Sequence, residues 1–223
     1  MMDRLLVAVI VVLTLFTAAI MALVARSEVA AHRVTVEPLR AQALSPGQWR
    51  RLTAGARLIS DQARTAAEQR ITIVAFSDFE CPACRRFSRI VTASKTRYGG
   101  RIAWMYRDYP LNAIHPEAMI AARAGVCADA AKTFRPFYEA VFNSQDSLAQ
   151  VHWPELARGA GVRDTVRFAS CLASAASARE VAHDMALGDS IGVSATPTVV
   201  INGLRLSRPP TTVELDSILI TLR

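Results

Sequence analysis

Two cysteines separated by two residues stand where a β-strand is expected to turn into an α-helix. The motif is Cys81-Pro82-Ala83-Cys84, and the apolar run Ile71–Phe76 before it has the composition of a buried strand. Residues 85–91 repeat apolar positions at helical spacing, and Pro82 fits a first helical turn, where its missing N–H costs nothing. Both thiols are therefore expected near the helix start, close enough to form one small disulfide ring.

The start of a helix stabilises a cysteine thiolate, because unpaired N–H groups and the positive end of the helix dipole lie there. A thiolate is the species that attacks a disulfide, so a lowered pKa makes Cys81 the expected nucleophile. Cys84 is then placed to resolve the mixed disulfide by attacking Cys81 and releasing the partner. The motif therefore predicts thiol–disulfide exchange.

Two alternatives stay open for this motif: half of a zinc site, or an incidental structural disulfide. Zinc normally needs two further ligands at matching spacing. The remaining cysteines, Cys127 and Cys171, form no second C-x-x-C, and no tight cluster of cysteine and histidine appears. We therefore favour redox activity and expect neither a bound metal nor a cofactor.

The elements that must position these cysteines follow from the periodicity of the chain. A helix is predicted over 82–98, a second strand over 102–107 and an almost wholly helical block from about 114 to 187. Strand character returns at 198–201, the turn Asn202-Gly203 favours a hairpin with 204–206, and a short helix closes the chain. This order predicts an α/β fold in which helices lie on the faces of a mixed sheet.

The segment Leu5–Ala25 carries no charge and has the length and composition of a membrane-spanning helix. The nearest cleavage-like residues, Val29–Ala31, lie well past it, which favours an uncleaved signal anchor over a cleaved signal peptide. We expect an anchor at residues 1–25, a polar spacer at 26–56 and a catalytic domain at 57–222. Four cysteines in a membrane-delivered chain indicate an oxidising compartment.

The formal net charge is +7, but the arginines are scattered and form no long basic block. A positive balance of this kind is typical of a solvated surface, so nucleic-acid binding is not expected. The expected lipid contact is through the N-terminal helix.

Three polar residues have less specific interpretations. Glu80 is read as a modest influence on the pKa of Cys81, a proton relay or a solvated acid. His115, which precedes Pro116, is read as a helix cap or a surface residue. Asp78 is a candidate for a position beneath the active site.

The segment Phe76-Ser77-Asp78-Phe79-Glu80-Cys81-Pro82-Ala83-Cys84 resembles the active-site signature of DsbA-like thiol-disulfide oxidoreductases, within the thioredoxin superfamily. Residues 192–203 are similar to the loop and strand around the cis-proline of that family. Residues 106–111 and 115–122 resemble the beginning of its helical insertion. The likeness covers roughly residues 57–222 in the same order, and it implies a thioredoxin-like fold with a helical insertion at about 113–188.

The resemblance implies that the Thr196–Pro197 peptide is cis and lies opposite Cys81. Cis X–Pro bonds are uncommon and are retained for local geometry. The main chain of Thr196 would then bind an extended substrate peptide by strand-like pairing. From the residues alone, the alternative is a trans proline that starts an edge strand.

Many relatives carry a second, structural disulfide in the insertion, and the resemblance therefore implies that Cys127 pairs with Cys171. Such a bridge would close a loop of about 45 residues and contribute roughly 4 kcal/mol on the chain-entropy estimate. The alternative is two buried free thiols that act as small hydrophobic residues.

Together these observations predict a single-pass protein of the cytoplasmic membrane whose catalytic domain lies in the periplasm or another extracytoplasmic space. The predicted enzyme oxidises thiols of cysteine-containing proteins, and a redox partner, a quinone-linked membrane protein as in DsbA systems, reoxidises it. DsbA has a histidine between its cysteines where this chain has Pro82-Ala83, so an isomerase or a reductase stays open. A third alternative is a tethered chaperone or metal-delivery module with Cys81 and Cys84 as soft ligands.

Overall fold

The computed structural model describes residues 16–21, 38–59, 71–98 and 102–222. The chain divides into two compact units, residues 1–38 and 39–223. In the first unit residues 16–21 are helical, and the rest of the predicted anchor Leu5–Ala25 lies outside the described residues. Within the part of the chain that is described, no helix has the length and apolar character needed to cross a bilayer.

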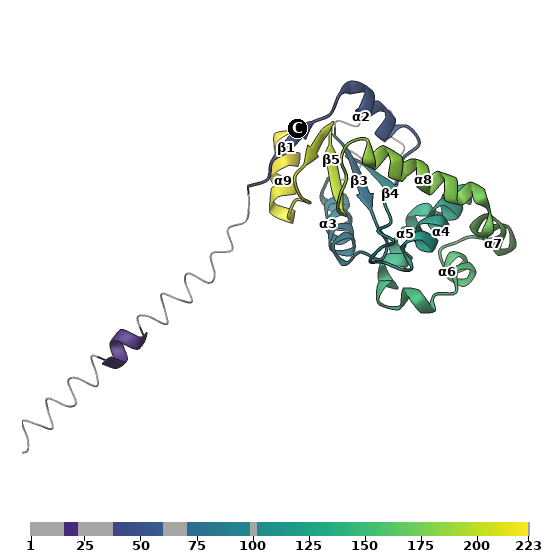
Figure 1. Cartoon of the computed structure of the whole chain (residues 1–223), viewed down its shortest axis with the longest axis horizontal. Helices are drawn as coiled ribbons and strands as arrows, with labels where there is room; N and C mark the ends of the chain where they lie inside the picture. The colour runs from purple at the N-terminus through teal and green to yellow at the C-terminus, as the bar shows by residue number, and fades with distance from the viewer. Residues whose placement is uncertain (1–15, 22–37, 60–70, 99–101, 223) are drawn as a thin grey trace, which may run out of the picture. The chain divides into compact units, whose positions relative to one another are not determined.

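The second unit is built on a six-stranded sheet with the order β1-β6-β5-β3-β4-β2 (Figure 1). Its central strand β3 (Ile71–Ser77) runs parallel to β4 (Ile102–Asp108) and antiparallel to β5 (Thr198–Ile201). The outer strands are β6 (Leu204–Leu206) and β1 (Ala41–Ala43) beyond β5, and β2 (Arg57–Leu58) beyond β4. The predicted mixed sheet of an α/β fold is confirmed.

Helices pack on both faces of the sheet, which explains why β3 is apolar along its length. Ile73 of β3 and Phe87 belong to the larger core cluster on one face, whereas Val74 packs with Leu52 and Leu187 on the other. The helices concerned are α3 (Pro82–Tyr98) and α9 (Thr212–Thr221) on the first face, and α2 (Pro46–Thr53) and α8 (Ala175–Asp189) on the second.

The segment between β4 and β5 is a helical insertion, as predicted, and Figure 1 shows it beside the sheet. It consists of α4 (Ala118–Ala130), α5 (Phe134–Asn143), the 3-10 helix η2 (Gln145–Gln150), α6 (Trp153–Gly159), α7 (Thr165–Ala173) and α8. Phe79, which follows β3, stacks on Tyr106 of β4 and contacts Phe142 of α5 with the two rings tilted. Aromatic packing therefore joins the loop after β3 to the insertion.

The predicted boundary between spacer and domain is wrong. Residues 39–56 were expected to belong to a spacer, but they contribute β1 and α2 to the folded unit, and residues 26–37 lie outside the described residues. The Ser45 side chain accepts the N–H of Gln48, whose own side chain accepts the N–H of Ser45, so a capping box starts α2. Leu52 then buries its side chain completely.

A buried cluster of four charges fixes the edge of the sheet. Arg57 of β2 pairs with Asp108 of β4 and, at 3.3 Å, with Asp184 of α8. Arg107 pairs with Asp184 at 2.5 Å and donates its Nε–H to the main-chain oxygen of Leu52 in α2 at 3.0 Å. Burial raises the pKa of Asp108 to about 7, against the opposing effect of Arg57.

Candidate active site

Cys81 lies at the junction of the loop after β3 and the first turn of α3. Its N–H donates to the oxygen of Asp78 at 3.2 Å, and its own oxygen accepts the N–H of Arg85 at 3.2 Å, which starts the helical hydrogen bonding. Cys84 lies three residues into the helix and is 1% exposed, whereas Cys81 is 7% exposed. Both cysteines are free thiols in this structure.

The two thiols have opposite pKa shifts. The pKa of Cys81 falls from 9.0 to about 5, first because the Cys84 thiol donates a hydrogen bond to its thiolate, and further through the Thr196 side chain and the N–H groups of Cys84 and Ala83. Burial raises the pKa of Cys84 well above 9.0, and the neighbouring Cys81 thiolate raises it further. At neutral pH the pair therefore consists of a reactive Cys81 thiolate and a protonated Cys84.

Thr196 faces Cys81 from the loop before β5. The Thr196–Pro197 peptide is cis, and the Cys81 Sγ–H donates to the main-chain oxygen of Thr196 at 3.4 Å. The Thr196 hydroxyl oxygen is buried, and among the described residues it has no hydrogen-bond partner. It is therefore available to donate to the thiolate, which lowers the pKa of Cys81 after the larger effect of the Cys84 thiol.

Asp78 holds the loop that precedes Cys81 through its buried carboxylate. Its side chain is fully buried and accepts the N–H of Glu80 at 2.8 Å and the N–H of Leu111 at 2.9 Å. The second oxygen of this carboxylate also lies 2.6 Å from Nδ1 of His115. The Asp78 N–H donates to the sulfur of Cys84 at 3.4 Å, so one residue connects the buried thiol to the segment after β4.

Two further contacts tie the same loop to the insertion. The Glu80 carboxylate accepts the N–H of Glu117 at 2.7 Å, immediately before α4 begins. The Gln145 side chain donates to the oxygens of Phe79 at 2.6 Å and Cys81 at 3.0 Å. The main chain on both sides of Glu80 is thereby held by the insertion.

Comparison with known proteins places the chain in a family. A family model described as Thioredoxin matches residues 65–220. The chain belongs to this thioredoxin family.

Solved structures of thioredoxin-superfamily oxidoreductases share its fold. The thioredoxin-like oxidoreductase from Silicibacter pomeroyi DSS-3 is 22% identical, with a TM-score of 0.62 over 74% of this chain and 91% of that chain. Alpha-DsbA1 from Wolbachia pipientis is 19% identical, with a TM-score of 0.62 over 75% of this chain and 90% of that chain. The predicted thioredoxin-like fold of the DsbA-like kind is therefore confirmed.

Curated relatives of this thioredoxin-family chain are much longer. The Na(+)/H(+) antiporter NhaA 1 from Mycolicibacterium gilvum is 30% identical over 151 residues, which make up 67% of this chain and 24% of the antiporter. The chain thus spans about a quarter of the length of the curated relatives it matches.

The thioredoxin fold brings together four of the residues singled out in the sequence, Cys81, Cys84, Thr196 and Pro197. Two further cysteines, Cys127 of α4 and Cys171 of α7, are joined by a disulfide with an S–S distance of 2.04 Å. Across the described ranges, no group of three or more His, Cys, Asp or Glu side chains is arranged to hold a metal ion.

Two polar residues of the site make contacts that the sequence does not predict, and a third was not singled out. His115 makes no helix cap, because α4 has Glu117 at its N-cap position, and it pairs with Asp78 instead. Glu80 binds the main chain of Glu117 rather than standing free in solvent. Gln145 was missed altogether, since a lone glutamine some 60 residues from the cysteines forms no local pattern.

Proposed function

We propose that this chain is a thiol–disulfide oxidoreductase that exchanges disulfides with cysteine-containing proteins through Cys81 and Cys84. The observation that carries the proposal is the Cys81 thiol at the start of α3, with a pKa of about 5, facing the main chain of Thr196. A nucleophile needs its thiolate form, and a low pKa provides that form at neutral pH.

The oxidised enzyme contains a Cys81–Cys84 disulfide. A substrate thiolate attacks the sulfur of Cys81, the enzyme disulfide breaks, and Cys84 leaves as a thiolate that takes up a proton because of its raised pKa. A second substrate thiolate then attacks the substrate sulfur of the mixed disulfide and releases Cys81 as a thiolate. Two substrate thiols become one disulfide, and the enzyme disulfide becomes a thiolate and a thiol.

The main chain of Thr196 is the proposed docking point for the substrate. Its oxygen lies 3.4 Å from the sulfur of Cys81, so a peptide hydrogen-bonded to Thr196 has its own cysteine beside the nucleophile. Pro197 has no N–H, and proline is the residue type that tolerates the cis peptide found at this point. Strand-like pairing of this type recognises main chain and therefore accepts many sequences.

Oxidation of substrates is the proposed direction. Each hydrogen bond to the Cys81 thiolate stabilises the reduced enzyme, and a stabilised reduced form makes the disulfide a stronger oxidant. Equilibration of the protein with glutathione buffers measures the reduction potential of the Cys81–Cys84 pair. A value near that of thioredoxin, about −270 mV, would contradict an oxidase and favour a reductase of the same fold.

Turnover tests the catalytic assignment. Oxidised wild-type protein is expected to form disulfides in a reduced peptide with two cysteines, whereas the Cys81→Ser variant forms none. The matched Cys84→Ser variant retains the nucleophile and is expected to accumulate a mixed disulfide at Cys81. A Cys81→Ser variant that still turns over would refute the assignment.

We further propose that the enzyme is anchored in the cytoplasmic membrane with its catalytic domain outside the cytoplasm. The uncharged segment Leu5–Ala25 supports the anchor, and a Cys127–Cys171 disulfide suits an oxidising compartment. A quinone-linked membrane protein is the proposed redox partner. Protease added to spheroplasts should remove the domain, and a domain that is cleaved only after lysis would refute this location.

A further inference from the structure

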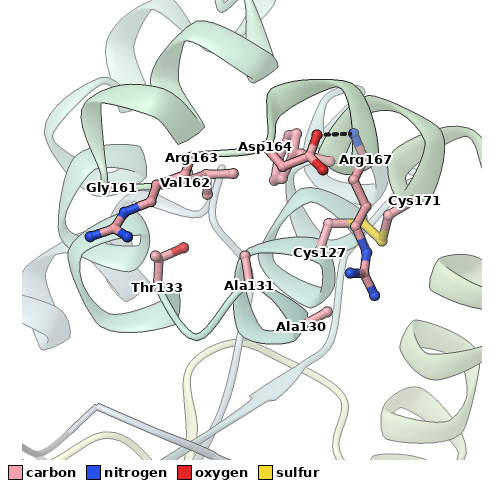
Figure 2. Close-up of a pocket in the computed structure, with 11 residues that line it drawn as sticks. Cys127, Ala130, Ala131, Thr133, Gly161, Val162, Arg163, Asp164, Arg167 and Cys171 are labelled. Atoms are coloured by element: carbon pink, nitrogen blue, oxygen red, sulfur yellow. Dashed lines mark hydrogen bonds between the residues drawn. A yellow bond between two sulfur atoms is a disulfide. The ribbon is translucent and has the colours of Figure 1, made fainter.

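The Cys127–Cys171 disulfide lines an open cavity of about 470 Å³ (Figure 2). The cavity lies between the C-terminal end of α4, the loop 161–164 and the outer side of α7. None of its lining residues belongs to the site around Cys81. A disulfide that borders an open cavity can be reached by a small molecule, whereas one enclosed in a core cannot.

The two cysteines of this disulfide differ in exposure. Cys127 is 2% exposed, while Cys171 is partly exposed on α7. An incoming thiolate can therefore approach the sulfur of Cys171 more easily, and Cys127 becomes the leaving group.

Two cations border the cavity, and one of them lies beside the disulfide. Arg163 and Arg167 both line it and both are exposed; in Figure 2 the Arg167 side chain extends beside the disulfide, whereas Arg163 extends at the opposite end of the lining. Within the described residues, neither guanidinium group has an ion pair or hydrogen bond, and the one lining carboxylate, Asp164, accepts the main-chain N–H of Arg167 at 2.8 Å. The cavity is thus positively charged, which attracts anions and stabilises a thiolate that leaves there.

We propose that this cavity is a second thiol-exchange site, which takes small anionic thiols and allows them to reduce the Cys127–Cys171 disulfide. A thiolate attracted into the cavity by its cationic lining attacks the sulfur of Cys171 beside Arg167, the protein disulfide breaks, and Cys127 leaves as a thiolate and gains a proton. A second molecule of the thiol attacks the mixed disulfide and releases Cys171. Two small thiols become one disulfide, and the protein disulfide becomes two thiols.

The test uses the full chain with Cys81→Ser and Cys84→Ser, so that only the second pair reacts and the result is independent of the proposed function. The rate of reduction is measured with glutathione, which is anionic, and with cysteamine, which is cationic, each corrected for its thiolate fraction. Glutathione is expected to react about 10-fold faster than cysteamine, in the range of electrostatic steering. Peptide mapping of the trapped intermediate should find glutathione on Cys171.

The variant that decides the role of the cations adds Arg163→Gln and Arg167→Gln. It should lose the preference for glutathione, whereas the matched Arg50→Gln variant, changed on the exposed side of α2, should keep it. Added salt should lower the rate of reduction by glutathione and leave the rate with neutral 2-mercaptoethanol unchanged. This measurement needs no variant. Equal rates for the two charged thiols, a rate unchanged by salt, or a disulfide that resists millimolar thiol in the folded protein would each overturn the proposal.

Discussion

Nδ1 of His115 lies 2.6 Å from the carboxylate of Asp78, the residue whose N–H donates to the buried sulfur of Cys84. The two residues come from different segments of the chain. The Asp78 oxygen that His115 contacts also accepts the N–H of Leu111. The pair therefore fixes the segment after β4 against the loop that carries Cys81.

Removal of His115 should destabilise the folded protein. In the His115→Ala variant, the buried Asp78 carboxylate loses one of its three partners, and an imperfectly paired buried group costs about 1–3 kcal/mol. Urea unfolding of the oxidised protein measures the loss. His152→Ala, at a histidine whose side chain is 70% exposed, is the control and should change the free energy of unfolding by less than about 0.5 kcal/mol. Equal effects of the two substitutions would contradict the role of the pair.

The Thr196→Val substitution should raise the pKa of Cys81. Valine has a similar volume but cannot donate to the thiolate, and one such hydrogen bond corresponds to about one pKa unit. The ultraviolet absorbance of the thiolate, followed against pH, measures the change. Thr198→Val removes the hydroxyl of the first residue of β5, which donates to the oxygen of Ala195, and it should leave the pKa of Cys81 nearly unchanged.

The reduced protein should lose stability as the pH falls. The pKa of Cys81 is lower in the folded state, at about 5, than its ordinary value of 9.0, so its stabilising contribution is present above pH 9 and is lost as the pH falls through 5. The oxidised protein has no thiol at this position and lacks this term. The free energy of unfolding of the reduced form, relative to that of the oxidised form, should therefore decrease steadily as the pH is lowered from 9 to 5. A constant difference would show that the thiolate is not stabilised.

Asp108 should have the opposite pH dependence. Its folded pKa of about 7 lies above the ordinary value of 3.8, so its contribution is present below pH 3.8 and is lost as the pH rises through 7. The stability of the wild type relative to Asp108→Asn should therefore decrease between pH 4 and pH 7. Urea unfolding of both proteins across this range measures the effect, and parallel curves would argue against a raised pKa.

Local patterns in the sequence were sufficient for the reactive motif, the sheet and the insertion. Cys81 and Cys84 lie within one helical turn, and β3 and α3 have clear periodicities, so short windows contain the information. The contacts made by Asp78, Glu80 and Gln145 are long-range pairings with other elements, and no local pattern indicates a partner that only the folded chain brings close. The boundary of the spacer was predicted wrongly for a different reason. The Ser45–Gln48 capping box is a local signal for the start of a helix, but it lies in an otherwise polar segment.

The hydrogen bond from Glu117 to Glu80 means that the insertion is not a separable cassette. A chimera that took residues 111–189 from another thioredoxin-family protein would replace the main chain that both Asp78 and Glu80 bind. The two acids before Cys81 would then have to be exchanged together with the insertion. For protein engineering, the catalytic turn and the helices beyond β4 are one exchangeable unit.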